Sequence, residues 1–196
     1  DGTTQTLYIN GEAAGSSEVP GPTDEWNLDL LVGTCWNMEG TAGFQQHMFK
    51  GLLDDVKLYN RSLSADEIKE LADIAAPAAD DLLVDLDMEA VDQNTVTNQA
   101  DGKTYDVLGD APTWEASKDG HGQALRFDGN TNYINLGQDY QFTTGQLTIS
   151  AWVNIDPSPN GLSRITGRAR TAVPDEKELG LRIRNNGKLE AECPGY

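Results

Sequence analysis

The sequence predicts an all-β protein: an antiparallel β-sandwich of the jelly-roll type with one short helix near residues 64–74. Two observations lead to this fold class. Short segments in which apolar and polar residues alternate recur along the chain, and clusters of Gly, Asn, Asp and Pro separate them. A single segment departs from this alternation and carries apolar residues at helical spacing.

The first strands come before residue 33. Leu7 and Ile9 alternate with polar residues and run into Asn10-Gly11, a dipeptide typical of a two-residue hairpin turn. Residues 28–32 form the next alternating run, which Gly33 ends. We therefore expect a hairpin followed by a separate strand.

Residues 53–59 predict a further strand with an unusual residue on its inward face. Asp54 has the same parity as Val56 and Leu58, whose side chains we expect to point into the core. A carboxylate on a core face needs a partner. The position of Asp54 therefore calls for a specific explanation.

The predicted helix has a clear start. Ser64 and Glu67 form a capping box, in which each side chain bonds the other residue's backbone amide, and Ile68, Leu71 and Ala72 follow at helical spacing. A stretch of small residues with one Pro follows at 76–80. We interpret it as a linker between segment 1–75 and segment 81–196.

The second segment continues the strand pattern. Asn185-Asn186-Gly187 lies between two alternating runs and predicts a second hairpin. The predicted strands of this segment contain residues 82–86, 125–127, 134–136, 147–153, 179–183 and 189–193.

Composition excludes two classes of function. The chain has 196 residues, with 14 Lys and Arg against 32 Asp and Glu, a formal charge of −18 and a calculated isoelectric point of about 4.2. A surface this acidic repels phosphate, so we expect no nucleic-acid partner. The sequence contains no apolar run long enough to cross a bilayer, and we expect no membrane insertion. An acidic surface suits divalent cations, which bind oxygen ligands.

Cysteine usage leaves two alternatives open. Cys35 and Cys193 are the two cysteines, and with two His residues in the chain a zinc site is not expected. The cysteines form a disulfide if the compartment is oxidising, or they are unrelated thiols. The chain begins in what looks like the approach to a strand, so we expect it to be a piece of a longer protein.

Several motifs resemble one family. Residues 49–68, FKGLLDDVKLYNRSLSADEI, resemble the closing strand and helix of laminin-G-like, or concanavalin A-like lectin/glucanase, jelly-roll domains, and residues 6–12 resemble an earlier strand. Residues 120–129, 133–136 and 147–153 resemble the opening half of such a domain. The family's C-terminal half therefore comes before its N-terminal half.

This inverted order has two interpretations. The chain is a window across two tandem repeats, or its two halves close on each other into one circularly permuted sandwich. We favour closure, because an isolated half would leave strand edges unpaired. Exchange of halves between two chains satisfies the same pairing, so an exchange dimer is the main alternative.

The resemblance also implies a structural calcium ion at the rim of the sandwich. The matching positions are Asp54 in the closing strand, Asp87 near the first strand, and Asn98 and Asp101 in a loop where the family usually has a leading Asp. An Asn carbonyl is also a calcium ligand. The alternative is that Asp54 pairs with an Arg or caps a turn.

Aromatic residues are the candidates for sugar binding, because sugar rings stack on flat side chains. Trp26, Trp36, Tyr105 and Trp114 lie in segments rich in turn residues, where binding residues concentrate. Packing over a sheet edge is the alternative for each. Trp152 lies opposite the apolar face of its strand, but the family motif around it suggests a structural role.

One basic cluster, Arg164, Arg168 and Arg170, occurs in this acidic chain. An anionic glycan is one partner for it, although a solvated loop paired with nearby acids is the simpler expectation.

No catalytic pattern is present in the sequence. Glycosidases need two carboxylates across the scissile bond, and the alternating acids that glucanases of this fold carry on one strand do not occur here. We therefore expect a non-catalytic, calcium-stabilised module of an extracellular or cell-surface protein that binds a glycan or polysaccharide. The alternative is an adhesion or spacer module with a protein partner.

Overall fold

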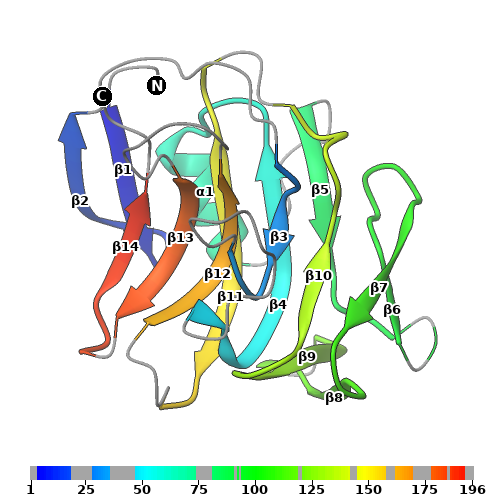
Figure 1. Ribbon diagram of the computed structural model, residues 1–196. Coiled ribbons are helices and arrows are strands. Elements are labelled where there is room, and N and C mark those ends of the chain that lie inside the picture. The colour runs from blue at the N-terminus through cyan, green and yellow to red at the C-terminus, as the bar shows by residue number, and fades with distance from the viewer. Residues whose placement is uncertain are drawn as a thin grey trace.

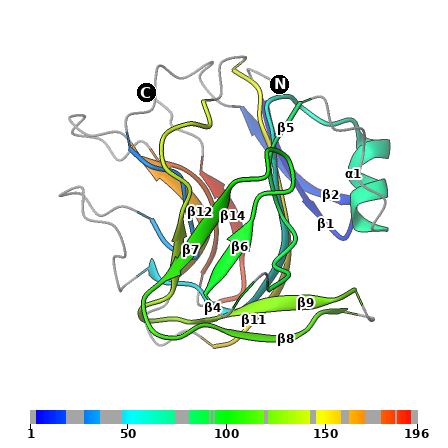
Figure 2. The same cartoon turned by 90° about the vertical axis from the view of Figure 1, so that its right-hand side faces the viewer.

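The computed structural model describes residues 4–18, 28–35, 47–73, 81–90, 92, 94–118, 121–141, 145–157, 162–169, 178–184 and 186–192 (Figure 1). These residues form an antiparallel β-sandwich with one helix, which confirms the predicted fold class. Two sheets face each other, and helix α1 (Ala65–Ala72) lies outside the sheet that contains β4 (Figure 2).

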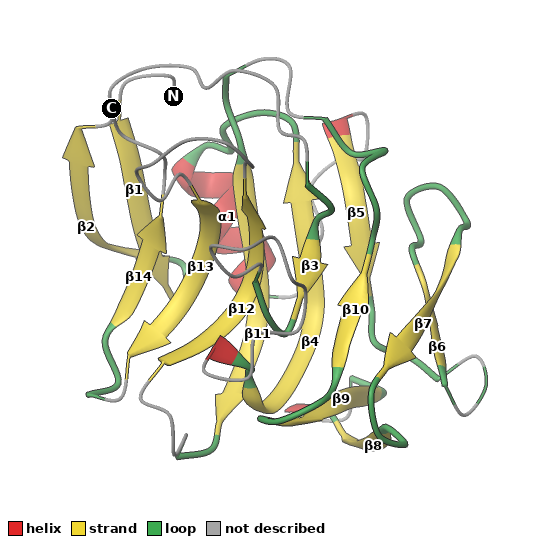
Figure 3. Ribbon diagram, in the orientation of Figure 1, coloured by secondary structure: helices red, strands yellow, loops and turns green. Residues whose placement is uncertain are grey.

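The larger sheet has seven strands. Their spatial order is β14 (Leu189–Glu192), β13 (Glu178–Arg184), β12 (Leu162–Ala169), β3 (Leu31–Val32), β10 (Tyr133–Asn135), β7 (Thr104–Leu108) and β6 (Thr95–Thr97). The strand arrows of this sheet run across the front of Figure 3.

The smaller sheet has five strands and centres on β4 (Lys50–Tyr59). Its other strands are β11 (Thr148–Ile155), β9 (Gln123–Asp128), β8 (Thr113–Ala116) and β5 (Leu82–Leu86). A separate hairpin of β1 (Thr4–Ile9) and β2 (Glu12–Glu18) turns at Asn10-Gly11, as predicted.

Strands from the two segments of the chain interleave. β3 lies between β12 and β10 in the seven-stranded sheet. β4 pairs along one edge with β11, and along the other with β9 through residues 50–53 and with β5 through residues 56–59. Each sheet therefore contains strands of both segments. Circular permutation of a family domain stays a prediction.

The helix begins as predicted. Ser64 is the N-cap, its hydroxyl accepts the backbone N–H of Glu67, and the Glu67 carboxylate accepts the backbone N–H of Ser64 at 2.8 Å. Arg61 adds two N–H donors to the same carboxylate, at 3.0 and 2.7 Å. These contacts hold the pKa of Glu67 low, at about 2, with the Arg61 hydrogen bonds as the largest cause.

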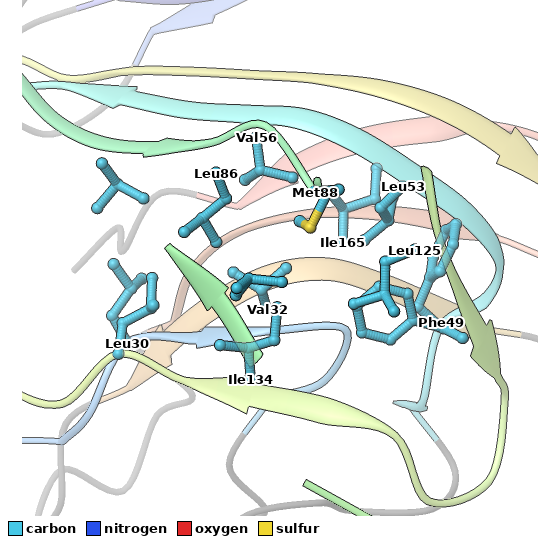
Figure 4. Close-up of a cluster of buried hydrophobic side chains, with 14 of the residues drawn as sticks. Leu30, Val32, Phe49, Leu53, Val56, Leu86, Met88, Leu125, Ile134 and Ile165 are labelled. Atoms are coloured by element: carbon cyan, nitrogen blue, oxygen red, sulfur yellow. The ribbon is translucent and has the colours of Figure 1, made fainter. Parts of the chain in front are cut away.

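One apolar core fills the space between the sheets (Figure 4). Phe49 precedes β4 and Phe127 lies on β9, and their buried rings meet edge to face with centroids 5.9 Å apart. The labelled core residues also include Leu30, Val32, Leu53, Val56, Leu86, Met88, Leu125, Ile134 and Ile165. The core therefore joins the same two segments that the sheets join.

A β-bulge corrects the prediction that Asp54 points inward. Leu53 and Val56, three residues apart, both belong to the apolar core, and the register against β11 shifts between Ser150 and Trp152. Asp55 has φ of +48° at this point. The extra residue reverses the alternation, so Asp54 lies on the face of β4 away from the core. Strict alternation, on which the prediction rested, fails at a bulge.

No helix among the described residues is long and apolar enough to span a membrane.

The close approach of Gly33 to Phe127 gives a prediction about stability. Gly33 has φ of +85°, and a Cβ there would overlap the Phe127 ring, whose buried position leaves it no room to move. We expect Gly33→Ala to lower the free energy of unfolding by about 2–4 kcal/mol, because overpacking adds to backbone strain. Urea unfolding followed by fluorescence measures this loss.

Gly102→Ala is the matched control. Gly102 has φ of +75°, but a methyl group added there would meet nothing within 4 Å, so only the backbone term of about 1 kcal/mol applies. Equal losses in the two variants would show that Gly33 does not contact Phe127 closely.

Candidate functional site

The four predicted sugar-binding aromatics divide into two groups. Trp26 and Trp36 lie outside the described residues. Trp114 on β8 and Tyr105 on β7 are described, and both pack against the apolar core. Their contacts are those of the alternative interpretation, in which such aromatics pack against the sheets.

The hydroxyl of Tyr105 belongs to a partly buried polar network. This hydroxyl makes a short hydrogen bond with the hydroxyl of Tyr140, which donates to Asp101 Oδ2 at 2.8 Å. Asn98 Nδ2 donates to the same Tyr140 oxygen at 3.0 Å. Burial, followed by the Tyr105 hydrogen bond, raises the pKa of Tyr140, so this phenol stays protonated and acts as a structural link.

The polar atoms of Asn98 are all engaged. Its Oδ1 accepts the backbone N–H groups of Asp85 at 2.7 Å and Ala100 at 3.2 Å, and its Nδ2 also donates to the Leu83 carbonyl at 3.0 Å. Asn98 is fully buried. These bonds tie the loop after β6 to β5, and they leave the amide oxygen of this predicted calcium ligand without a free lone pair.

Asp54 occupies a different environment. It is 5% exposed, its Oδ1 accepts the backbone N–H of Asp55 at 2.8 Å, and its Oδ2 accepts a short hydrogen bond from the Ser117 hydroxyl. Burial is the largest effect on its pKa, and repulsion from Asp55 and Glu89 adds to it; together they raise the pKa to about 6. The charges that act most strongly on Asp54 are thus negative.

Asp87 lies near the same acidic group. Burial raises its pKa, and Asp85 and Glu89 add repulsion. Glu89 Oε1 accepts the backbone N–H of Gln123 at 2.7 Å, which holds it over Gly122. The four predicted calcium ligands therefore fall into two groups. Asp54 and Asp87 both interact electrostatically with Glu89. Asn98 and Asp101 both form hydrogen bonds with Tyr140.

The four predicted metal ligands do not form one coordination shell. In the described part of the chain, no three side chains from His, Cys, Asp and Glu are grouped so that they could hold a metal ion. Calcium takes six to eight oxygen ligands, and Asn98 and Asp101 already serve the Tyr140 network.

An aromatic patch lies on the outer face of the smaller sheet. Trp152 on β11 is the cross-strand neighbour of Asp54, and its neighbours Ala151 and Val153 pack against the core, so the indole points outward. Lys118 Nζ lies 4.5 Å from the Trp152 ring centroid. We call Asp54, Ser117, Lys118 and Trp152 the Trp152 patch. It combines a flat ring with a carboxyl, a hydroxyl and an ammonium group.

Sequence reasoning assigned Trp152 a structural role and so missed this patch. The signal was the parity of Trp152 within residues 147–153, which places it opposite the apolar face. Ser117 and Lys118 carried no signal, because the β8–β9 hairpin brings them to β4 and β11 from a distant part of the chain.

The basic cluster is not a solvated loop. Arg164 and Arg168 lie on β12 and are buried. Arg168 donates to the carbonyls of Leu28 at 2.7 Å, Gln138 at 3.3 Å and Tyr140, so it ties the end of β12 to neighbouring loops. Burial lowers the pKa of Arg168. Arg170 and Cys193 lie outside the described residues. Cys35 is buried, and its Sγ lies 3.1 Å from His47 Nδ1.

The raised pKa of Asp54 predicts a pH dependence of stability. A carboxyl whose pKa is higher in the folded state favours folding below its ordinary pKa of 3.8, and this contribution is lost as pH rises through about 6. We expect the free energy of unfolding of the wild type, relative to Asp54→Asn, to fall by about 2 kcal/mol between pH 4 and pH 7. Urea unfolding at a series of pH values measures this difference.

Asp106→Asn, which removes an exposed carboxylate on β7, is the control and should keep the wild-type profile. If the profiles of Asp54→Asn and the wild type run parallel, Asp54 is not held in a buried, acid-rich environment.

Comparison with known proteins agrees with this architecture. Residues 1–69 match the family model of the concanavalin A-like lectin/glucanases superfamily. No curated protein and no solved structure matches the chain. The matched residues supply β1 to β4 and most of α1, and β3 and β4 are completed by strands of the second segment. Residues 1–69 are therefore similar to domains of the concanavalin A-like lectin/glucanases superfamily.

Proposed function

We propose that this domain is a non-catalytic, lectin-like module of an extracellular protein and that it binds a glycan. The observation that carries the proposal is the Trp152 patch. An outward indole beside the Ser117 hydroxyl and the Lys118 ammonium group matches what a sugar offers, since its C–H face packs on a ring and its hydroxyls bond to polar groups. The similarity of residues 1–69 to a superfamily of lectins and glucanases supports the same class of ligand.

The geometry of Asp54 favours binding over hydrolysis. A glycosidase acid or nucleophile must present an oxygen to the substrate, and a second carboxylate must lie across the bond. Both oxygens of Asp54 accept hydrogen bonds, from Asp55 N–H and Ser117 Oγ–H. Glu89 accepts the Gln123 N–H. We propose that these acids shape a binding surface and do not carry out catalysis.

Substitution of Trp152 tests whether the Trp152 patch binds the sugar. We expect Trp152→Ala to weaken binding of the best ligand from a glycan array at least tenfold in calorimetry, because a central aromatic contact commonly contributes more than about 1 kcal/mol. Tyr133→Ala, which removes a half-buried ring from β10 in the other sheet, should leave the affinity unchanged.

Three outcomes would contradict this assignment. Unchanged affinity in Trp152→Ala, with loss in Trp36→Ala, would move the site to the predicted loops. Failure to bind any glycan would favour the adhesion or spacer module. Release of reducing ends from a bound polysaccharide would make the domain an enzyme.

We also propose that calcium stabilises the domain, through Asp54 and Glu89 and not through the four residues predicted together. Asp54 is buried, and the strongest charges acting on it are carboxylates, so a cation would relieve the repulsion. Main-chain carbonyls and water would have to complete the shell, since two carboxylates are too few for calcium. No step of glycan binding is assigned to the ion.

Thermal melts test the calcium proposal. We expect about 1 mM calcium to raise the melting temperature by about 5 °C over the value in EDTA, because a ligand of the folded state stabilises it by mass action. Asp54→Asn should abolish the shift, and Asp101→Asn should retain it. The same melting temperature with calcium and with EDTA would remove calcium from the account.

Our proposal about assembly is a dimer in which two chains exchange their first segments. Since β3 and β4 pair with strands of the second segment, exchange of segment 1–75 between two chains would preserve every pairing in a dimer. Sedimentation equilibrium distinguishes this exchange dimer from a closed monomer.

A further inference from the structure

The hairpin of β1 and β2 ends the molecule on one side with an open strand edge (Figure 1). All seven residues of β2 are exposed, and within the described residues β2 pairs with β1 alone. In an antiparallel pair, half of a strand's backbone N–H and C=O groups point away from its partner. With respect to the part of the chain that the structure describes, the outer edge of β2 therefore offers a row of unpaired donors and acceptors.

Two contacts hold this edge in place. A Cβ at Gly11 in the turn would lie 3.0 Å from Ala72 Cβ and 3.3 Å from Lys69 Cα, so the turn packs directly against helix α1. β1 also contacts β14 at the edge of the seven-stranded sheet. The hairpin is supported at the turn and along β1. Binding at β2 should therefore cost little conformational entropy.

β2 lacks most features that natural proteins use to block an edge. It contains no Lys or Pro, and between Glu12 and Glu18 it carries only Ala, Gly and Ser. A side chain at Gly15 would meet nothing within 4 Å. A bulge near Ala14 interrupts the register close to the turn, while Gly15 to Glu18 pair regularly with β1. An incoming strand can therefore approach this stretch closely.

The charges on β2 select the occupant. If two copies paired antiparallel along their full β2 strands, centred on Gly15, Glu12 of each would face Glu18 of the other, and like charges directly opposite are destabilising. The net charge of −18 on each copy adds to this repulsion. A strand with basic side chains at its ends would instead place opposite charges at both positions.

We propose that the open edge of β2 is a docking site for an extended segment of another polypeptide, with basic residues about six positions apart facing Glu12 and Glu18. Backbone pairing supplies the affinity, and the two ion pairs supply register and selectivity. This interaction is independent of the glycan site, which lies on the outer face of β4 and β11.

The experiment uses a capped seven-residue peptide, Lys-Thr-Val-Thr-Val-Thr-Lys, and a second peptide with Glu in place of both Lys. We expect fluorescence anisotropy to show the Lys peptide binding the wild type roughly tenfold more tightly than the Glu peptide, and raised salt to reduce the difference. Amide shifts in NMR spectra should concentrate in residues 12–18.

Charge reversal supplies the decisive comparison. Glu12→Lys with Glu18→Lys should invert the preference, so that the Glu peptide binds more tightly. Asp106→Lys with Asp110→Lys changes the net charge equally, at β7 and the loop after it, on the side of the molecule opposite β2 (Figure 1), and should keep the preference for the Lys peptide. Thermal melts of both variants confirm that they are folded.

Several results would overturn the proposal: no binding of either peptide, a preference that follows net charge equally in both double variants, or amide shifts outside β2. Concentration-dependent dimerisation that protects residues 12–18 would assign the edge to a second copy of the chain instead.

Discussion

Everything in this domain depends on β4 being completed on both edges by strands from the later segment. β11 fills one edge, and β9 and β5 share the other. Pairing on both edges leaves few backbone groups of β4 in need of a partner. The same pairings bring Asp54 beside Trp152 and, through the β8–β9 hairpin, beside Ser117. The strand pairings that close the sandwich therefore also bring the residues of the Trp152 patch together.

The sequence predicted what local interactions decide. The capping box at Ser64, the hairpin at Asn10-Gly11 and the second hairpin near Gly187 all appear in the structure, because each depends on residues a few positions apart. The alternating runs likewise became strands. The family resemblance added that the late and early motifs belong to one architecture, and the family model matches the first of these motifs.

The sheet face to which each side chain points was harder to predict than the positions of the strands. One extra residue at Asp55 reversed the expected direction of Asp54, and a bulge leaves no clear trace in a pattern of apolar residues. Tyr105 and Trp114 pack against the core although their segments are rich in turn residues. Arg168 is buried because backbone carbonyls partner its guanidinium group in place of acids. In each case a tertiary contact overrode a correct local pattern.

The most direct measurement of this account is a double-mutant cycle on Phe49 and Phe127, which come from the two segments and meet in the core. Phe49→Leu, Phe127→Leu and the double variant are unfolded in urea. Packing between the segments predicts a coupling energy of about 1 kcal/mol between the two rings. If the two losses add to within about 0.3 kcal/mol, the rings do not touch, and the segments do not share one core.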